Sequence, residues 1–142
     1  MTFWKCNKCK RRFEKKNQPH SCVYYPVEKH LKNKDYTKKL YSKLKTIIKT
    51  KIGNFRIESL PCCIHFVTTA TNYTFMCVYA LRNGLKMHFT LPDEIRSSRL
   101  SRLTKMSSHR YLYELNIKTT DEINSELVAW LKKGYHMKTV NK

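Results

Sequence analysis

The chain of 142 residues suits one ordinary domain, or one small domain with an appendage. Hydrophobic residues make up 41% of it, which excludes wholesale disorder, and its apolar runs are too short and interrupted to cross a bilayer. The formal net charge of +19 favours a polyanionic partner, because such a field speeds encounter with phosphates and raises non-specific affinity. A solvated surface in a Lys-rich protein would give the same charge, so both interpretations stay open at this point.

The N-terminal part of the chain is constrained by the expected compartment and by the cysteines. The opening residues lack the continuous apolar stretch of a secretory signal, so we expect a cytoplasmic protein without a membrane partner. In the reducing cytosol, six Cys indicate metal binding more often than disulfides. The positive charge is also concentrated at this end, since residues 1–51 carry +13 and residues 52–142 carry +6.

The first motif is CNKCKRRFEKKNQPHSC, which starts at residue 6. It contains two close pairs of possible metal ligands, Cys6 with Cys9 and His20 with Cys22. Zinc prefers four such sulfur and nitrogen donors in a tetrahedron, with each short pair spanning one edge. Because protein side chains fill all four positions, the motif predicts a structural zinc knuckle over residues 1–22 and leaves no position for an activated water.

Aromatic and basic side chains surround these ligands in the sequence. Three aromatic residues could cover the metal, since so short a segment cannot otherwise build a core: Phe3, Trp4 and Phe13. Six cations lie between the ligands: Lys8, Lys10, Arg11, Arg12, Lys15 and Lys16. If zinc folds the segment, we expect these cations to face a nucleic-acid backbone and to act almost without regard to base sequence.

After the knuckle, residues 23–34 are predicted to be a linker, because Pro26 and a polar run break any period. Apolar residues then recur at helical spacing over residues 35–53. Asp35 could cap the first amide groups of this helix, and Gly53 could end it in a left-handed turn.

The period then changes to two, which predicts strands. Alternating or continuous apolar runs occupy residues 55–59, 62–69 and 73–82. Asn83 and Gly84 supply the positive φ angles of a tight hairpin, which leads into another strand over residues 84–91.

The C-terminal part alternates again over residues 110–117 and then returns to helical spacing. Thr119 and Glu122 predict a capping box at the start of this second helix, and Gly134 its end. The predicted fold is therefore α+β. A zinc knuckle and a linker precede an α+β domain of residues 35–142, in which a helix, an antiparallel meander of about five strands and a C-terminal helix share one core.

A second basic motif, RSSRLSRLTKMSSHR, precedes the last predicted strand and repeats a cation at every third position. The four cations are Arg96, Arg99, Arg102 and Lys105. In a helical or 3₁₀ turn, this spacing stacks them along one side while the apolar residues between them dock on the sheet. We expect a second phosphate contact here, with an ordinary solvated loop as the alternative.

The remaining cysteines and strand histidines suggest no further site. Cys62, Cys63 and Cys77 lie in apolar strand patterns and are expected to be core thiols. As neighbours in a strand, Cys62 and Cys63 would face opposite sides, which argues against a shared metal. His65 and His88 are expected to be ordinary sheet histidines.

Two stretches of the chain resemble an uncharacterised, mainly bacterial family of small proteins. They are WKCNKCKRRFEKKNQPHSC at one end, and LPDEIRSSRLSRL through RYLYELNIKTTDEINSELVAWLKKGY at the other. The family's C-terminal domain has no known function, and related domains occur beside endonuclease-like domains, so the resemblance implies a nucleic-acid setting but brings no enzymatic activity. Members usually carry Gly after the second Cys, where this chain has Lys10, so we expect strain there of about 1 kcal/mol.

The sequence therefore favours a non-enzymatic, zinc-binding protein that binds nucleic acid mainly through phosphate contacts. No Gly-rich phosphate loop, acid pair or nucleophile with its base stands out, so a role within a nuclease system is the least favoured interpretation. The alternative from another class is a sensor or adaptor whose sheet domain binds a small anion or a protein partner.

Overall fold

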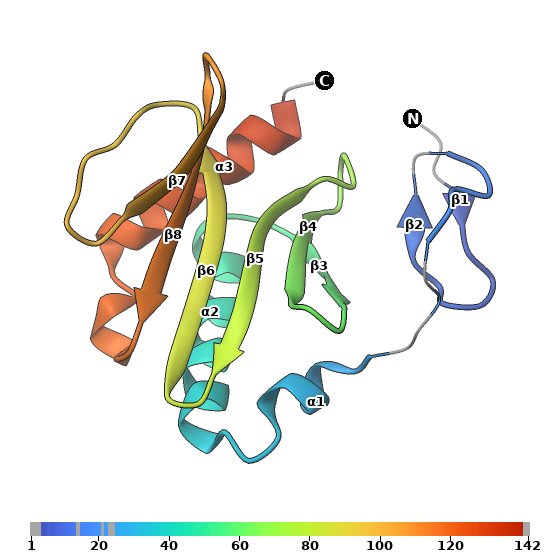
Figure 1. The fold of residues 1–142 in the computed structure, drawn as a ribbon, viewed down its shortest axis with the longest axis horizontal. Coiled ribbons are helices and arrows are strands. Elements are labelled where there is room, and N and C mark those ends of the chain that lie inside the picture. The colour runs from blue at the N-terminus through green and yellow to red at the C-terminus, as the bar shows by residue number, and fades with distance from the viewer. Residues whose placement is uncertain (1–3, 14, 21, 23–24, 141–142) are drawn as a thin grey trace.

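The computed structural model describes residues 4–13, 15–20, 22 and 25–140. Within them the fold is α+β, as predicted, with a small two-stranded sheet at the N-terminal end and a six-stranded antiparallel sheet in the main domain (Figure 1). The elements are β1 (Trp4–Lys5), β2 (Arg12–Phe13), α1 (Val27–Leu31), α2 (Asp35–Lys51), β3 (Phe55–Ser59), β4 (Ile64–Thr68), β5 (Thr74–Leu81), β6 (Gly84–Leu91), β7 (Ser101–Ser107), β8 (Arg110–Ile117), the 3₁₀ turn η1 (Thr120–Glu122) and α3 (Ser125–Val140).

The large sheet has the strand order β3-β4-β5-β6-β8-β7. Its first five strands in this order are those that the two-residue periodicity predicts. The sixth, β7, forms where we expected a helical turn, and its Leu103 and Met106 side chains are 45% and 58% exposed instead of docked on the sheet. Pairing with β8 satisfies backbone groups that would otherwise be open along the outer edge of that strand, and this tertiary gain overrides the three-residue spacing.

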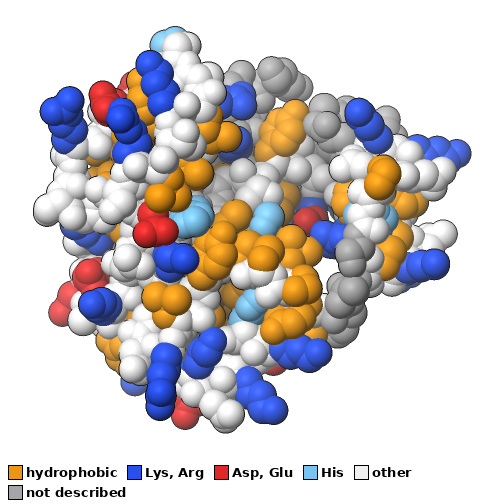
Figure 2. Space-filling model, viewed as in Figure 1, with side chains coloured by type: hydrophobic (Ala, Val, Ile, Leu, Met, Phe, Trp, Pro, Cys, Tyr) orange, Lys and Arg blue, Asp and Glu red, His pale blue; other side chains and the backbone are white. Residues whose placement is uncertain are grey.

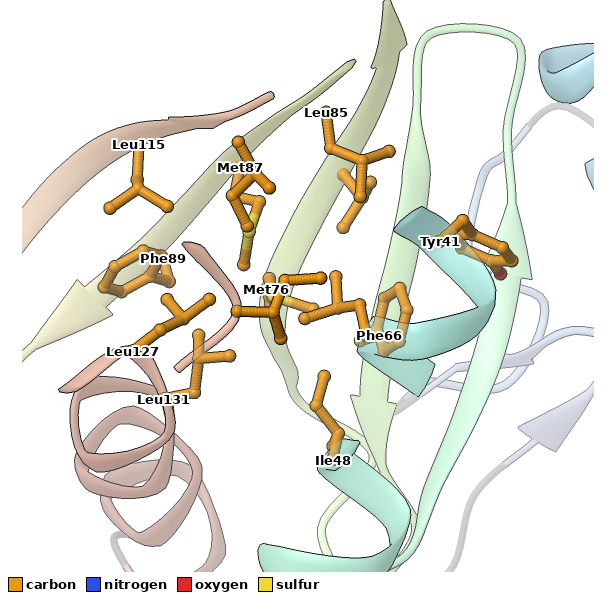
Figure 3. Packing of buried hydrophobic residues seen from close by; sticks show 14 of the residues in the cluster. Tyr41, Ile48, Phe66, Met76, Leu85, Met87, Phe89, Leu115, Leu127 and Leu131 are labelled. Atoms are coloured by element: carbon orange, nitrogen blue, oxygen red, sulfur yellow. The ribbon is translucent and has the colours of Figure 1, made fainter. Parts of the chain in front are cut away.

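The helices α2 and α3 lie behind the sheet in the view of Figure 1 and cover one of its faces. Leu40, Leu44 and Ile48 of α2 are fully buried, and Leu127 and Leu131 of α3 are buried beside them. In Figure 3 these helices turn their apolar side chains toward those of the strands. Full burial of such a side chain contributes about 1.5–3 kcal/mol, so the two predicted stripes and the sheet form the main core. Among the described residues, every helix is too short or too polar to span a bilayer.

The predicted linker of residues 23–34 contains a helix, so the main domain begins before Asp35. In α1, His30 and Leu31 are buried, and His30 Nε2 lies 2.7 Å from the Leu60 carbonyl oxygen, so the ring donates a hydrogen bond to the segment before β4. A helix of one turn needs no repeating apolar period, since contacts with the rest of the domain can hold it. The sequence pattern therefore gave no sign of it.

The chain's glycines differ from their predicted roles, because none of them has a positive φ. Helix α2 ends at Lys51 without a left-handed Gly53, and α3 continues through Gly134. The predicted hairpin forms, but Gly84 already pairs with Leu81 inside the ladder. A Cβ would lie 2.6 Å from Tyr135 Oη at Gly53, 2.6 Å from the Ile117 oxygen at Gly84 and 2.8 Å from the Thr90 oxygen at Gly134. Close approach of other elements explains all three positions.

Candidate metal centre and basic surfaces

The four predicted ligands at the N-terminal end lie together. Their ligand atoms are all within 4.8 Å of one another. The Sγ atoms of Cys6 and Cys22 are 3.6 Å apart, and His20 Nε2 lies 3.4 Å from Cys9 Sγ and 3.2 Å from Cys22 Sγ. Two sulfurs at about 2.3 Å from one tetrahedral ion would be about 3.8 Å apart, so these four residues are close enough to bind a single metal ion.

A tight backbone turn brings Cys6 and Cys9 together. Strand β1 pairs with β2, and the segment between them closes with two hydrogen bonds of 2.9 Å: the Lys10 amide donates to the Cys6 carbonyl, and the Cys6 amide to the Arg11 carbonyl. Lys10 has a φ of 65° in this turn. The left-handed conformation thus falls at the position where the sequence predicted strain, because this chain carries Lys where the resembling family carries Gly. We call β1, β2 and the described residues up to Cys22 the N-terminal hairpin.

The imidazole of His20 is oriented for metal binding. Its Nδ1 lies 2.7 Å from the Gln18 carbonyl oxygen, which can only accept a hydrogen bond, so Nδ1 carries the proton and donates it. Nε2 is then left with a lone pair that faces the sulfurs of Cys9 and Cys22. Such a hydrogen bond from the other ring nitrogen is the usual support of a metal-bound histidine. The same bond is the main cause that raises the pKa of His20.

Aromatic rings cover this centre as the sequence predicts. The centroid of the Phe13 ring is 4.2 Å from that of His20, and the Trp4 ring is 5.9 Å from both. Phe3 lies outside the described residues. The rings shield one side of the ligand set, since the hairpin has little other apolar material with which to exclude water.

The thiol environments favour deprotonation at two of the ligands, Cys6 and Cys9. Burial raises the pKa of Cys9, but hydrogen bonding with Arg11 outweighs burial and the pKa is lowered. Hydrogen bonding by the Cys9 backbone is the largest cause that lowers the pKa of the Cys6 thiol to about 6, and the Lys8 backbone adds to it. The thiolate is the metal-binding form of cysteine. Hydrogen bonding with Cys6 is the main cause that raises the pKa of the neighbouring Cys22, because the protonated thiol can donate to the Cys6 sulfur. Burial and repulsion between two thiolates raise it further.

Comparison with protein families identifies the main domain. Residues 27–138 match DUF5655, a domain of unknown function. The chain belongs to the DUF5655 family. Comparisons with curated proteins and with solved structures find no match in either. The DUF5655 domain begins at the first residue of α1, in agreement with the burial of that helix, and the metal ligands precede it.

The predicted basic residues of the N-terminal hairpin are mostly at the surface. Five of the six have exposed side chains: Lys8, Lys10, Arg12, Lys15 and Lys16. The sixth, Arg11, is partly buried and stacks on the Phe13 ring at 5.2 Å from its centroid. A hydrogen bond of 3.2 Å from the Asn72 side-chain amide to the Arg12 carbonyl joins the hairpin to the DUF5655 domain.

The second group of predicted cations does not form the expected row. Arg99 turns toward the start of α3, where it donates to Glu126 Oε1 at 2.8 Å and to the Glu122 carbonyl at 2.7 Å. Arg102 forms an ion pair with Glu94, and Lys105 lies over the Tyr111 ring. Arg96 is exposed in the loop before β7. Two of the four guanidinium or ammonium groups are therefore engaged with acids of the DUF5655 domain, and a phosphate contact by this group stays a prediction.

The expectation that Cys62 and Cys63 point apart is wrong. Their Sγ atoms are 3.2 Å apart, and both lie within 4.8 Å of a ring nitrogen of His65. The alternation argument fails because β4 starts only at Ile64, while Pro61 and Cys62 form a bend. Pro61 was the available signal, since a proline interrupts a strand pattern and invalidates the count of faces before it.

Proposed function

We propose that this protein is a non-enzymatic zinc protein that binds nucleic acid, with contacts mainly to the phosphate backbone. The observation that carries this proposal is the placement of five exposed cations around one compact set of metal ligands. A polyanion would meet a concentrated positive surface there, on a chain that carries a formal net charge of +19.

Zinc is the metal that suits the donors of the N-terminal hairpin. Three thiols and one imidazole are the ligand types that zinc prefers in structural sites. When bound, the ion would supply the cross-link that fixes the short hairpin, and it would have no open position for a substrate. Cys6, Cys9 and Cys22 would hold it with the Nε2 atom of His20, whose ring the Gln18 carbonyl already orients.

Phosphate contacts suit the cations of the N-terminal hairpin better than base contacts do. The side chains are mainly Lys, which carries a flexible point charge without the planar fork that reads base edges. The resemblance to a family with relatives beside endonuclease-like domains also supports a nucleic-acid setting. We therefore expect binding that varies little with sequence and strongly with salt.

Filter-binding titrations against duplex DNA, single-stranded DNA and RNA at several salt concentrations test the proposal. The informative variant replaces Lys8, Lys10 and Arg12 by Gln. Each lost phosphate contact lowers the slope of log affinity against log salt by about 0.7–0.9, so we expect a fall of roughly 2–3. The matched control makes the same change in charge on the exposed side of α2 by replacing Lys38, Lys39 and Lys49, and should alter the slope much less.

Two results would count against the proposal. If the hairpin variant binds with an unchanged slope, the N-terminal hairpin makes no phosphate contacts. If the unaltered protein binds none of the three nucleic acids even at low salt, the alternative of a sensor or adaptor for a small anion or a protein partner takes its place.

A further inference from the structure

A second group of soft ligand atoms lies in the DUF5655 domain, at the start of β4. The Sγ atoms of Cys62 and Cys63 and a ring nitrogen of His65 are all within 4.8 Å of one another. The two sulfurs are 3.2 Å apart, which is shorter than the separation of about 3.8 Å expected when one tetrahedral ion binds both. A small rotation of the exposed Cys62 side chain would therefore open enough room for an ion.

Cys77 adds another sulfur from the neighbouring strand. It is the Cα partner of His65 across the β4–β5 pairing, so the two side chains project from the same face of the sheet. Its Sγ atom is not among the group of ligand atoms that lie within 4.8 Å of one another, so Cys77 stands beside that group on the neighbouring strand. We call these four residues the β4 thiol cluster: Cys62, Cys63, His65 and Cys77.

The β4 thiol cluster lies on the face of the sheet that α2 and α3 leave open. Met76 and Val78 on either side of Cys77 belong to the core under the helices, so Cys77 points away from it. Figure 2 views this open face and shows histidine and apolar side chains gathered at its centre, with Lys and Arg side chains around them. The cluster thus lies on the face opposite α2 and α3, and its Cys62 side chain is exposed to solvent.

One side of the cluster is open to solvent, so an ion can reach it, and the other side is buried, so water is partly excluded from the ligands. Cys62 is exposed, whereas Cys63 is only 2% exposed. The Thr74 hydroxyl lies 3.3 Å from His65 Nδ1, and this contact restricts the orientation of the imidazole. An ion could enter past Cys62 and be held on its other side by Cys63.

We propose that the β4 thiol cluster is a second zinc site, in which Cys62, Cys63 and His65 bind the ion. Cys77 lies outside the group of atoms within 4.8 Å of one another, so its side chain would turn toward the ion to complete the tetrahedron. Sulfur and imidazole donors select zinc over the oxygen-seeking cations calcium and magnesium. Binding replaces the thiol protons by the cation, and these protons pass to the solvent. The proposal is independent of nucleic-acid binding by the N-terminal hairpin, and either can fail while the other stands.

Zinc content of the purified full chain separates the two sites. We expect the unaltered protein to hold two zinc ions, and a variant with Cys62→Ser and His65→Gln to hold one. The matched variant with Cys6→Ser and His20→Gln should also hold one, because it alters the same residue types in the N-terminal hairpin. His109→Gln, an exposed histidine outside both groups, should leave two. A single zinc in the unaltered protein, lost only from the Cys6 and His20 variant, would overturn the proposal.

Cobalt provides a measurement that does not depend on zinc retained during purification. In the Cys6→Ser and His20→Gln background, Co²⁺ titration should produce thiolate-to-cobalt charge-transfer absorption that saturates at one equivalent. Adding Cys77→Ser should weaken this binding, and adding Cys62→Ser with His65→Gln should abolish the absorption. Circular dichroism of each variant confirms that the sheet is intact. Absence of the absorption in a folded Cys6 and His20 variant would reject the second site.

Discussion

The N-terminal hairpin and the DUF5655 domain differ in the contacts that stabilise each of them internally. Among the described residues of the hairpin, Cys6 is the one buried apolar side chain, and most other contacts are hydrogen bonds and ring contacts near the surface. The DUF5655 domain buries side chains from all three of its α-helices and most of its strands in a single cluster. The hairpin therefore has little apolar burial, and the proposed zinc would supply most of its stability, whereas the domain depends on removal of apolar surface from water.

This difference shows why one short sequence motif was so informative. Four donors at fixed spacing specify a local structure almost by themselves, because a metal ion constrains their geometry. A core made of many apolar side chains is specified collectively, so no single residue of the domain identifies it. The two regions should accordingly respond to different perturbations.

Of the changes considered, loss of the metal ligands should produce the largest difference in stability between the hairpin and the domain. Replacing Cys6 and Cys9 together by Ser should unfold the N-terminal hairpin, since metal binding contributes about 10–16 kcal/mol in zinc-finger peptides. The DUF5655 domain should stay folded because its core contains neither residue. Hydrogen exchange measured by mass spectrometry should become fast in residues 4–13 and stay slow in α2.

Fluorescence offers a second readout, because each region holds one of the two Trp residues, Trp4 in the hairpin and Trp130 in α3. Only the Trp4 signal should respond to the Cys6 and Cys9 change. A cooperative loss of the Trp130 signal as well would show that the hairpin and the domain are one folding unit, contrary to this comparison.

A cavity in the main core should destabilise the DUF5655 domain and leave the N-terminal hairpin unchanged. Leu44 is fully buried in α2, so Leu44→Ala should lower the free energy of unfolding of the domain by about 2–5 kcal/mol. Urea unfolding followed by the Trp130 signal measures this change. The control is Leu103→Ala on β7, where the side chain is 45% exposed and the expected change is within about 0.5 kcal/mol. Equal effects of the two substitutions would contradict the assignment of the core.

The smallest effect concerns the left-handed turn of the hairpin. Lys10 has a φ of 65°, a conformation that costs non-glycine residues about 1–2 kcal/mol. Greater freedom of glycine in the unfolded chain offsets part of the relief, so Lys10→Gly should tighten zinc binding by the hairpin only about fivefold. A competition titration with a chromophoric chelator measures this affinity.

The matched control for Lys10→Gly is Asn33→Gly in the DUF5655 domain. Asn33 has a φ of 58° but lies in the turn between α1 and α2, outside the hairpin, and asparagine tolerates this conformation better than lysine does. This control should leave the zinc affinity unchanged and alter the stability of the domain by less than the Lys10 change alters zinc binding. Weaker zinc binding by Lys10→Gly would show that the turn is not strained.

Much of the fold and of the candidate metal centre follows from the sequence, for local reasons. The apolar period changes along the chain, which locates α2, α3 and five strands, and Thr119 with Glu122 forms the predicted capping box, although it closes the 3₁₀ turn before α3. The metal ligands are likewise recognisable because their spacing is short. Each of these features depends on residues within a few positions of one another.

Other features depend on segments that meet only in the folded chain. β7 forms because β8 offers an open edge, and α1 is helical because His30 and Leu31 find a cover beside β4. The β4 thiol cluster exists because a bend at Pro61 turns Cys62 toward Cys63, and because strand pairing places Cys77 beside His65. The apolar periodicity of a single segment does not encode these long-range contacts.

The glycines express this division most clearly. The sequence alone determined that Gly53 and Gly84 lie near the ends of elements, and local rules assigned left-handed turns to these two and a helix stop to Gly134, through which α3 in fact continues. The tertiary structure decided otherwise, because Tyr135, the Ile117 carbonyl and the Thr90 carbonyl come so near that a Cβ at these positions would collide with them. Backbone freedom is a property of one residue, whereas the space around it is set by elements far away along the chain. Tyr135, which crowds Gly53, donates its hydroxyl hydrogen bond to the carbonyl of Asn54, 81 residues before it.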